Sequence, residues 1–341
     1  MGHSAIDLKP PYLVFVGDEG RTAYAKTAIG LVQWRRDQCL AQLRLSDSGA
    51  DLGLPDMTCA EAASRGAKSF VIGSATVGGI IPDAWRPVLI EAAQAGLDVV
   101  AGLHVRLGDD EALRKAAEES GVRLIDVRVP PADLPIASGK KRPGRRLLTV
   151  GTDCALGKKY TALQLEQDMR AVGLSTDFRA SGQTGIMIAG QGIPIDAVVS
   201  DFVTGAAELL SPDNEPDHWD VIEGQGAIFH PAYGAVSHGL LVGSQPDAVV
   251  VCHAAERTHV ASWPDFPLPS IGDVIERCLD IGRVTNPDIR CVGISANTSA
   301  LSDEAREDYL GRVSDEYGLP CVDPMISGTG PIVSRLKHDF P

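Results

Sequence analysis

Residues 147–161, LLTVGTDCALGKKYT, constrain the fold of this 341-residue chain more than any other stretch. An apolar run typical of a strand ends at Gly151, a short loop follows, and Lys158 opens a stretch with helical spacing. In this arrangement backbone N–H groups of the loop and of the first helical turn point at an anion, and the lysine adds a positive charge. The pattern predicts a phosphate-binding loop, with an ordinary strand-to-helix turn as the alternative.

The residue after Gly157-Lys158 is Lys159, where nucleotide hydrolases with such a loop place Ser or Thr as a magnesium ligand. A charged lysine cannot ligate magnesium, and Thr161 would face elsewhere on the helix. We therefore expect no metal and a phosphate-rich cofactor such as coenzyme A. The expected cofactor-binding residues are Gly151, Thr152, Asp153, Cys154, Ala155, Leu156, Gly157, Lys158, Lys159 and Tyr160.

Short apolar runs alternate with helical patterns along the whole chain, which is typical of parallel α/β sheets. In the first part we expect strands at 12–17, 69–75, 97–103 and 122–128, with helices at 22–40, 82–96 and 109–121. In the second part we expect strands at 147–151, 175–180, 219–223, 247–253, 289–295 and 319–323, with helices at 157–172, 197–210, 271–283 and 302–317.

Residues 129–146 interrupt the alternation with four Pro, two Gly and five cationic side chains. Such a composition is typical of a domain boundary. The predicted fold class is α/β, with a Rossmann-like parallel sheet and a P-loop NTPase-like parallel sheet. The expected division is an N-terminal domain at 1–135, a linker at 136–146 and a C-terminal domain at 147–341.

The formal net charge of −14 disfavours a nucleic-acid surface, because phosphate backbones need clustered Lys and Arg. The seven Cys form no CxxC pair, which favours reduced, buried thiols in a cytoplasmic protein. We expect no signal peptide and no membrane span. We also expect a homo-oligomer, although no sequence feature gives the number of subunits.

The segment WDVIEGQG at 219–226 is a second candidate for chemistry. Its apolar strand ends at Glu223, and the carboxyl ends of parallel strands line the ligand crevice of open α/β sheets. Glu223 is our first candidate for a general base, with a carboxylate that braces the loop as the alternative. Asp201 and His230 are the reserve candidates, and either could be structural instead.

A Gly-rich polar stretch, FRASGQTG at 178–185, follows another predicted strand. Its Arg179 could hold a carboxylate through two hydrogen bonds, and its Ser181, Gln183 and Thr184 could orient a substrate. Lys26 and Arg86, at strand ends of the first half, are candidates for a second carboxylate clamp. Asn297 follows a later strand and could contact a purine edge. A polar loop and surface salt bridges are the structural alternatives.

Five segments together resemble the D-glutamate N-acetyltransferase family: RLLTVGTDCALGKKYTAL, SGQTGIMIAG, SPDNEPDHWDVIEGQGAIFHPAYG, LLVGSQPDAVVVCH and AYAKTAIGLVQWR. The resemblance spans residues 12 to about 325 and implies a Rossmann-like domain joined to a P-loop domain. The P-loop half is similar to dethiobiotin synthetase. The family carries Gly-Lys-Lys-Tyr-Thr, and this chain departs from the family pattern at His238.

The resemblance implies transfer of acetyl from acetyl-CoA to the amine of D-glutamate, in D-glutamate catabolism. An ATP- and magnesium-dependent ligase or kinase is one alternative, and a non-catalytic protein that binds nucleotide or coenzyme A is another. The usual acetyltransferase motif, Arg/Gln-x-x-Gly-x-Gly/Ala, is not evident in the sequence. The expected phosphate site is therefore the loop at 151–158.

Overall fold

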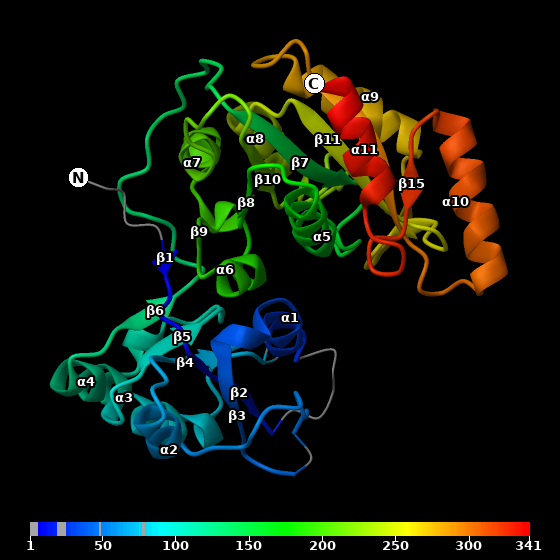
Figure 1. Cartoon of the computed structure of the whole chain (residues 1–341). Coiled ribbons are helices and arrows are strands. Elements are labelled where there is room, and N and C mark those ends of the chain that lie inside the picture. Colours follow the sequence, from blue (N-terminus) through cyan, green and yellow to red (C-terminus); the bar gives the residue numbers. More distant parts are fainter. Residues whose placement is uncertain (1–5, 19–24, 48, 75, 77–78) are drawn as a thin grey trace. The chain divides into compact units, whose positions relative to one another are not determined.

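The computed structural model describes residues 6–18, 25–47, 49–74, 76 and 79–341. The chain forms two compact units (Figure 1). The N-terminal unit contains residues 1–131 together with 182–197, and the C-terminal unit contains residues 132–181 and 198–341. Both units are parallel α/β structures, as the sequence predicts.

The N-terminal unit has a five-stranded parallel sheet in the order β3-β2-β4-β5-β6. Its strands are β2 (Tyr12–Gly17), β3 (Cys39–Arg44), β4 (Ser69–Ile72), β5 (Asp98–Ala101) and β6 (Leu124–Asp126). Its helices are α1 (Lys26–Arg35), α2 (Cys59–Ser64), α3 (Arg86–Gln94), α4 (Glu111–Ser120) and α6 (Gln183–Ala189). The strands are mostly buried on both faces, which explains their apolar runs.

Aromatic packing organises the core of this unit. The Phe15 ring lies 5.1 Å from the Phe70 ring and 5.0 Å from the Trp85 ring, measured between centroids. Helices α3 and α4 pack on each other, and α3 packs on β5. Asp110 caps α4 by accepting the Leu113 N–H, as its position before the helix allows.

The predicted helix at 22–40 is too long. Residues 22–24 lie outside the described part, α1 ends at Arg35, and β3 begins at Cys39. The sequence CLAQLR suits a helix locally, but these residues pair with β2 and are largely buried there. Pairing within the sheet therefore outweighs the local helical preference.

The C-terminal unit has a six-stranded parallel sheet in the order β15-β14-β11-β7-β10-β8. Its strands are β7 (Arg145–Gly151), β8 (Thr176–Arg179), β10 (Trp219–Ile222), β11 (Ala248–Ala254), β14 (Arg290–Asn297) and β15 (Cys321–Val322). Its helices are α5 (Lys158–Ala171), α7 (Val203–Leu210), α8 (Gly234–Ser244), α9 (Ile271–Gly282), α10 (Asp303–Tyr317) and α11 (Gly330–Asp339).

Helices cover the sheet of this unit (Figure 1). Helix α5 packs on β7, β8 and β10, and α11 packs on β14 and contacts α5. Helix α8 packs on β7, α9 packs on β11, and α7 lies against α8. A hairpin of β12 (His259–Val260) and β13 (Trp263–Pro267) follows β11. The central strand β7 thus delivers the chain to the predicted loop.

The division into units differs from the expected one in two respects. The segment at 182–197 packs with the N-terminal unit, because α6 contacts α1 and β9 (Gln191–Gly192) pairs with β1 (Ile6–Asp7). The segment at 136–146, expected as a linker, belongs to the C-terminal unit. There Arg142 donates to the Ser211 and Gly243 carbonyl oxygens, so the segment is held by ordered contacts.

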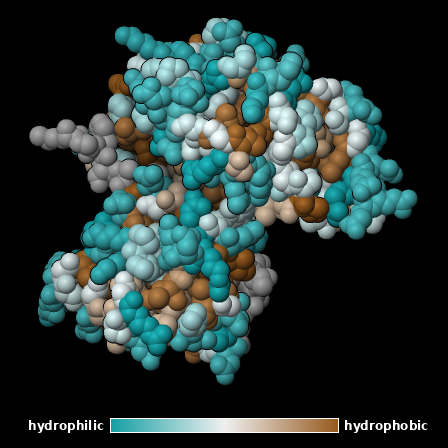
Figure 2. Space-filling view, viewed as in Figure 1, coloured by the Kyte–Doolittle hydropathy of each residue, from teal (hydrophilic) through white to brown (hydrophobic). Residues whose placement is uncertain are grey.

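The surface and the cysteine side chains have the character that the composition predicts. The viewed face carries mostly hydrophilic side chains with separate hydrophobic patches (Figure 2). All seven Cys are free thiols, and six of them are buried. Among the described residues, no helix combines the length and apolar character needed to cross a membrane.

Candidate functional site

The predicted phosphate loop connects β7 to α5 and is held by its backbone. Thr152 donates its N–H to the Cys252 carbonyl oxygen of β11 at 3.1 Å. Gly157 precedes the helix with φ 100°, in the left-handed region that favours glycine, and Ala155 has φ 52°. As in every helix, the first N–H groups of α5 have no acceptor within the helix. Such N–H groups can bind an anion, and here they lie at the carboxyl edge of the sheet.

Lys158 is the first residue of α5 and is buried. Its Nζ donates to the Asp153 carbonyl oxygen at 2.8 Å, across the loop. Burial lowers the pKa of Lys158, because a charged ammonium group loses its hydration there. Lys159 Nζ lies 4.3 Å from the centre of the Tyr160 ring, a cation–π contact. The two lysines therefore occupy different environments.

Thr161 faces away from the loop, as expected. Its hydroxyl lies 2.7 Å from Ser295 Oγ and 3.5 Å from Cys252 Sγ, in the interior between α5 and the sheet. The loop thus brings no hydroxyl to the position where a magnesium ligand follows the lysine in nucleotide hydrolases. The donor set of the loop fits a phosphate group better than a metal–nucleotide complex.

The Asp153 carboxylate is fully buried and braces the loop from inside. Its Oδ1 accepts the Cys154 N–H at 2.6 Å. Its Oδ2 accepts Arg257 Nη1 at 2.9 Å and the Ala261 N–H at 2.8 Å. Arg257 also donates to the Cys154 carbonyl oxygen at 2.7 Å. Asp153 is therefore neutralised by Arg257, which limits its repulsion of an anion in the loop.

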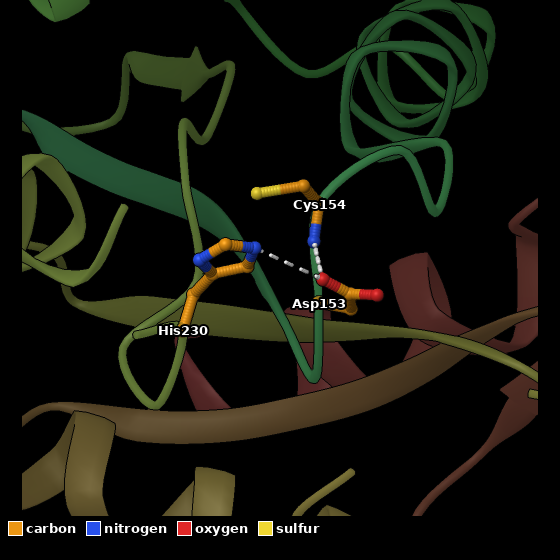
Figure 3. Close-up of side chains that lie close together, drawn as sticks. All are labelled: Asp153, Cys154 and His230. Carbon is orange, nitrogen blue, oxygen red and sulfur yellow. Dashed lines mark hydrogen bonds and ion pairs between the residues drawn. The ribbon is translucent and has the colours of Figure 1, made fainter. Parts of the chain in front are cut away.

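His230 lies beside Asp153 (Figure 3). Its Nδ1 accepts the N–H groups of Ala232 at 3.0 Å and Tyr233 at 3.1 Å, so the ring proton is on Nε2. Nε2 lies 3.8 Å from Asp153 Oδ1. The ring also packs against Tyr233 and Trp263. In this tautomer His230 holds its loop and offers no lone pair, which argues against its role as the reserve base.

Asp153, Cys154 and His230 bring three potential metal-ligand atoms within 4.8 Å of one another (Figure 3). Both Asp153 oxygens already accept hydrogen bonds, and Arg257 places a positive charge beside them. Burial raises the pKa of the Cys154 thiol, which favours its protonated form. The ligand atoms of these three side chains are therefore not free to bind a metal cation.

Glu223 follows β10 at the same carboxyl edge and is buried. Its Oε2 accepts the Ser181 N–H at 3.1 Å, and Ser181 Oγ donates to the Glu223 carbonyl oxygen. Gln225 Nε2 donates to Ser181 Oγ at 3.1 Å. A Cβ at Gly224 would lie 3.2 Å from Lys158 Cδ, so this segment borders the loop. The structure therefore brings Glu223 and Ser181 together, and the neighbouring Gly224 lies against Lys158.

Arg179 does not form the free clamp that the sequence suggests. Its Nε donates to Asp220 Oδ1 at 2.7 Å, and its Nη2 lies 3.4 Å from Asp177 Oδ2. Asp177, Arg179 and Asp220 occupy one face of the adjacent strands β8 and β10. The guanidinium group is thus already paired with two carboxylates.

Two further candidates of this unit lie on the surface. Asp201 is exposed in a short 3₁₀ helix, Ser200–Phe202, that precedes α7. Asn297 is exposed at the end of β14, and its Oδ1 accepts the Ser299 N–H at 3.0 Å. His238, the departure from the family pattern, is exposed on α8. Asp201 is therefore not a buried general base. The position of Asn297 gives no support for a purine contact.

The remaining substrate candidates belong to the N-terminal unit. Thr184 Oγ1 lies 3.1 Å from Thr27 Oγ1, and Gln183 is the first residue of α6. Lys26 is exposed at the start of α1. Arg86 is exposed and forms ion pairs with Asp110 and Asp83. Its guanidinium group is therefore already paired at the surface and does not form the expected clamp for a substrate carboxylate.

The sequence did not predict that Arg257 and His253 contact the loop. Arg257 supports the loop through Asp153, and His253 Nδ1 lies 2.9 Å from Thr152 Oγ1. Burial, followed by the Arg257 charge, lowers the pKa of His253. His253 lies near the end of β11, the strand that pairs with β7, and Arg257 follows that strand, so their position was the available signal.

A parallel sheet with a Gly-Lys loop after its central strand, joined to a Rossmann-like unit, defines a two-domain P-loop protein. A family model described as the P-loop domain of unknown function DUF1611 matches residues 135–333, and its Rossmann-like N-terminal partner matches 41–130. The chain belongs to the DUF1611 family.

Curated relatives extend this likeness over nearly the whole chain. A D-glutamate N-acetyltransferase from Tritonibacter scottomollicae is 47% identical over 329 residues, covering 96% of this chain and 99% of the relative. A D-glutamate N-acetyltransferase from Pseudoalteromonas sp. is 45% identical over 331 residues, covering 97% and 100%. The resemblance seen in the sequence is thereby confirmed.

A solved structure shares the fold. The crystal structure of a DUF1611 family protein from Anabaena variabilis ATCC 29413 superposes with a TM-score of 0.85 at 32% identity. The match covers 97% of this chain and 100% of that chain. The predicted fold class is confirmed.

Proposed function

We propose that this chain transfers an acetyl group from acetyl-CoA to the amino group of D-glutamate. The observation that carries the proposal is the identity of 47% and 45%, over nearly full length, to two relatives with this activity in their names. The geometry of the C-terminal unit supports it, because the loop after β7 suits a phosphate-rich cosubstrate without a metal.

The loop at 151–160 would hold phosphate groups of coenzyme A. The first N–H groups of α5 supply hydrogen-bond donors, and Lys158 and Lys159 supply positive charge. Lys158 would exchange its bond to the Asp153 carbonyl oxygen for a bond to phosphate. The Asp153–Arg257 pair would keep the loop in shape during this exchange.

Acetyl-CoA supplies a thioester whose carbonyl carbon is attacked by the amine nitrogen, with coenzyme A leaving as its thiol. Glu223 would take the proton that the amine loses. Three observations favour Glu223 over the reserve candidates: it is buried at the carboxyl edge of the sheet, His230 has its proton on Nε2, and Asp201 is exposed. Ser181 would position the carboxylate through its N–H bond to Oε2.

Replacement of Glu223 tests this assignment. The expected result for Glu223→Gln is a loss of turnover by about 10²-fold or more, as for other general bases, with unchanged calorimetric binding of coenzyme A. Asp201→Asn is the matched control, because the exposed Asp201 makes no contribution in this account. A fully active Glu223→Gln variant removes Glu223 from the role.

The alternative of an ATP-dependent ligase or kinase shares the loop and has its own signature. Under that alternative, EDTA abolishes turnover and ADP is released. Under the proposed function, turnover continues in EDTA and coenzyme A thiol appears instead. The same two assays also separate an enzyme from a protein that only binds coenzyme A.

A further inference from the structure

The N-terminal unit contains a cavity of about 170 Å³ that the sequence did not reveal. It lies beyond the carboxyl ends of β4 and β5, against α1 and the first turn of α6. By volume it has room for about six water molecules, or for one small organic molecule. Its described lining residues are Thr27, Ile72, Ser74, Thr76, Gly79, Gly102, Leu103, His104, Gln183 and Met187.

The cavity borders the position where α/β sheets usually bind ligands. From β2 the chain first adds β3 on one side and then β4 on the other, so the strand order reverses between β2 and β4. Crevices at such reversals, outside the carboxyl ends of the strands, are the usual ligand sites of open α/β sheets.

The Trp85 ring fills the space beside the end of β2. A Cβ placed on Gly17 would lie 2.8 Å from the indole atoms, and Trp85 Nε1 donates to Asp18 Oδ1 at 3.3 Å. The cavity itself lies beyond the ends of β4 and β5.

Three polar side chains of the cavity offer hydrogen-bond acceptors. Ser74 Oγ donates its hydrogen to the Val16 carbonyl oxygen at 2.9 Å, and Thr76 Oγ1 donates to the Ile80 carbonyl oxygen at 2.6 Å. Each hydroxyl therefore keeps only lone pairs for a ligand. Gln183 Oε1 is buried and has no hydrogen-bond partner among the described residues.

An unpartnered buried carbonyl oxygen carries a free-energy cost that a donor from a ligand removes. Three acceptors, from Ser74, Thr76 and Gln183, match the three N–H donors of a primary ammonium group. We infer that this cavity binds the ammonium group of the amino-acid substrate in the state before it loses its proton, with Gln183 Oε1 as the central acceptor. The inference rests on the proposed function for the identity of the ligand, D-glutamate.

Gly102 offers a direct way to disturb the acceptor. A Cβ at this position would lie 2.7 Å from Gln183 Oε1 and 3.2 Å from Met187 Cε. Both atoms are at the ends of flexible side chains, so Gly102→Ala displaces the carboxamide without forcing the backbone to move. Gly108→Ala is the matched control, because a Cβ at Gly108 has nothing within 4 Å. Gln183→Met removes the acceptor oxygen and keeps a side chain of similar size.

The test is calorimetric titration of the full chain with D-glutamate, and with glutarate, which lacks the amine. We expect D-glutamate to bind the wild-type chain at least tenfold more tightly than glutarate. In Gly102→Ala and Gln183→Met the D-glutamate affinity falls at least tenfold, a change of about 1.4 kcal/mol. Gly108→Ala binds like wild type, and coenzyme A binding is the same in all four proteins.

The inference is overturned if wild type does not bind D-glutamate, if glutarate binds as tightly, or if both cavity variants keep wild-type affinity for D-glutamate. The proposed function is judged separately, by acetyl transfer. If the chain binds D-glutamate more tightly than glutarate but forms no acetylated product, the inference stands and the proposed function is wrong. If both cavity variants turn over with an unchanged KM for D-glutamate, the proposed function stands and the inference is wrong.

Discussion

At the scale of the residue, Lys158 carries most of the anion-binding argument. The ammonium group of Lys158 is buried and donates to a carbonyl oxygen. This bond replaces the lost hydration only in part, so burial lowers the pKa of Lys158. A bound phosphate favours the charged ammonium group. Binding should therefore take up a proton, and affinity should decrease as the pH rises through the lowered pKa of Lys158.

This dependence can be measured by calorimetric binding of coenzyme A over a series of pH values below the ordinary pKa of lysine, about 10.4. The expected affinity falls as the pH rises, at most about tenfold per pH unit. Lys158→Met should weaken binding about tenfold or more at neutral pH and remove most of this pH dependence. An unchanged pH profile in Lys158→Met would show that another group titrates.

The sequence predicts the residues whose position follows from a strand end, and misses those whose role depends on a distant partner. Lys158 and Glu223 could be selected because each follows an apolar strand of a parallel sheet. Arg179 was selected for the same reason, but its partner Asp220 lies 41 residues away. No local pattern shows that its guanidinium group is already paired.

At the scale of the element, the contact between β7 and the segment after β10 determines the shape of the site. Gly224 donates its N–H to Thr149 Oγ1 at 3.0 Å, and a Cβ on Gly224 would lie 1.7 Å from the Thr149 carbonyl oxygen. That oxygen belongs to the backbone of a central strand. A side chain at 224 would therefore displace the segment that carries Glu223.

Gly224→Ala should lower the free energy of unfolding by about 3 kcal/mol, or leave the chain insoluble. Gly311→Ala, inside α10 with nothing within 4 Å of its new Cβ, should instead raise it by about 0.5–1 kcal/mol. Urea denaturation measures both changes. Equal stability of the two variants would contradict the close approach at Gly224.

The sequence did not reveal helices whose composition is typical of loops. The stretch at 183–189 reads as a Gly-rich loop but forms α6, which packs on α1. Helix α8 was missed because its sequence, GAVSHGLLVGS, is rich in Gly and Ser, which are poor helix formers. Strands β7 and β11 were predicted nearly to the residue, since buried parallel strands leave a continuous apolar run.

At the scale of the whole molecule, the chain enters its N-terminal unit twice. Residues 182–197 add α6 and β9 to the fold of residues 1–131, and β9 pairs with β1. Neither a boundary at 135 nor the composition of 129–146 indicates this. We propose that the N-terminal unit needs residues 182–197 for its full stability, so that it is not an independent domain that ends near residue 135.

A fragment of residues 1–131 should consequently be less stable than the same fragment joined to 182–197 by a flexible linker. The longer fragment regains the packing of α6 on α1 and the β1–β9 pairing, so its thermal midpoint should be higher by several degrees. Circular dichroism melting of both fragments measures the difference. Identical melting curves would mean that 182–197 adds nothing to this unit.

The central claim is that this chain acetylates D-glutamate from acetyl-CoA. The most direct measurement incubates the purified full-length chain with both compounds in EDTA, follows the free thiol, and identifies the product by mass spectrometry. The predicted result is one N-acetyl-D-glutamate formed for each thiol released, with no requirement for ATP. Absence of both thiol and acetylated product, or product formation only with ATP and magnesium, would contradict the claim.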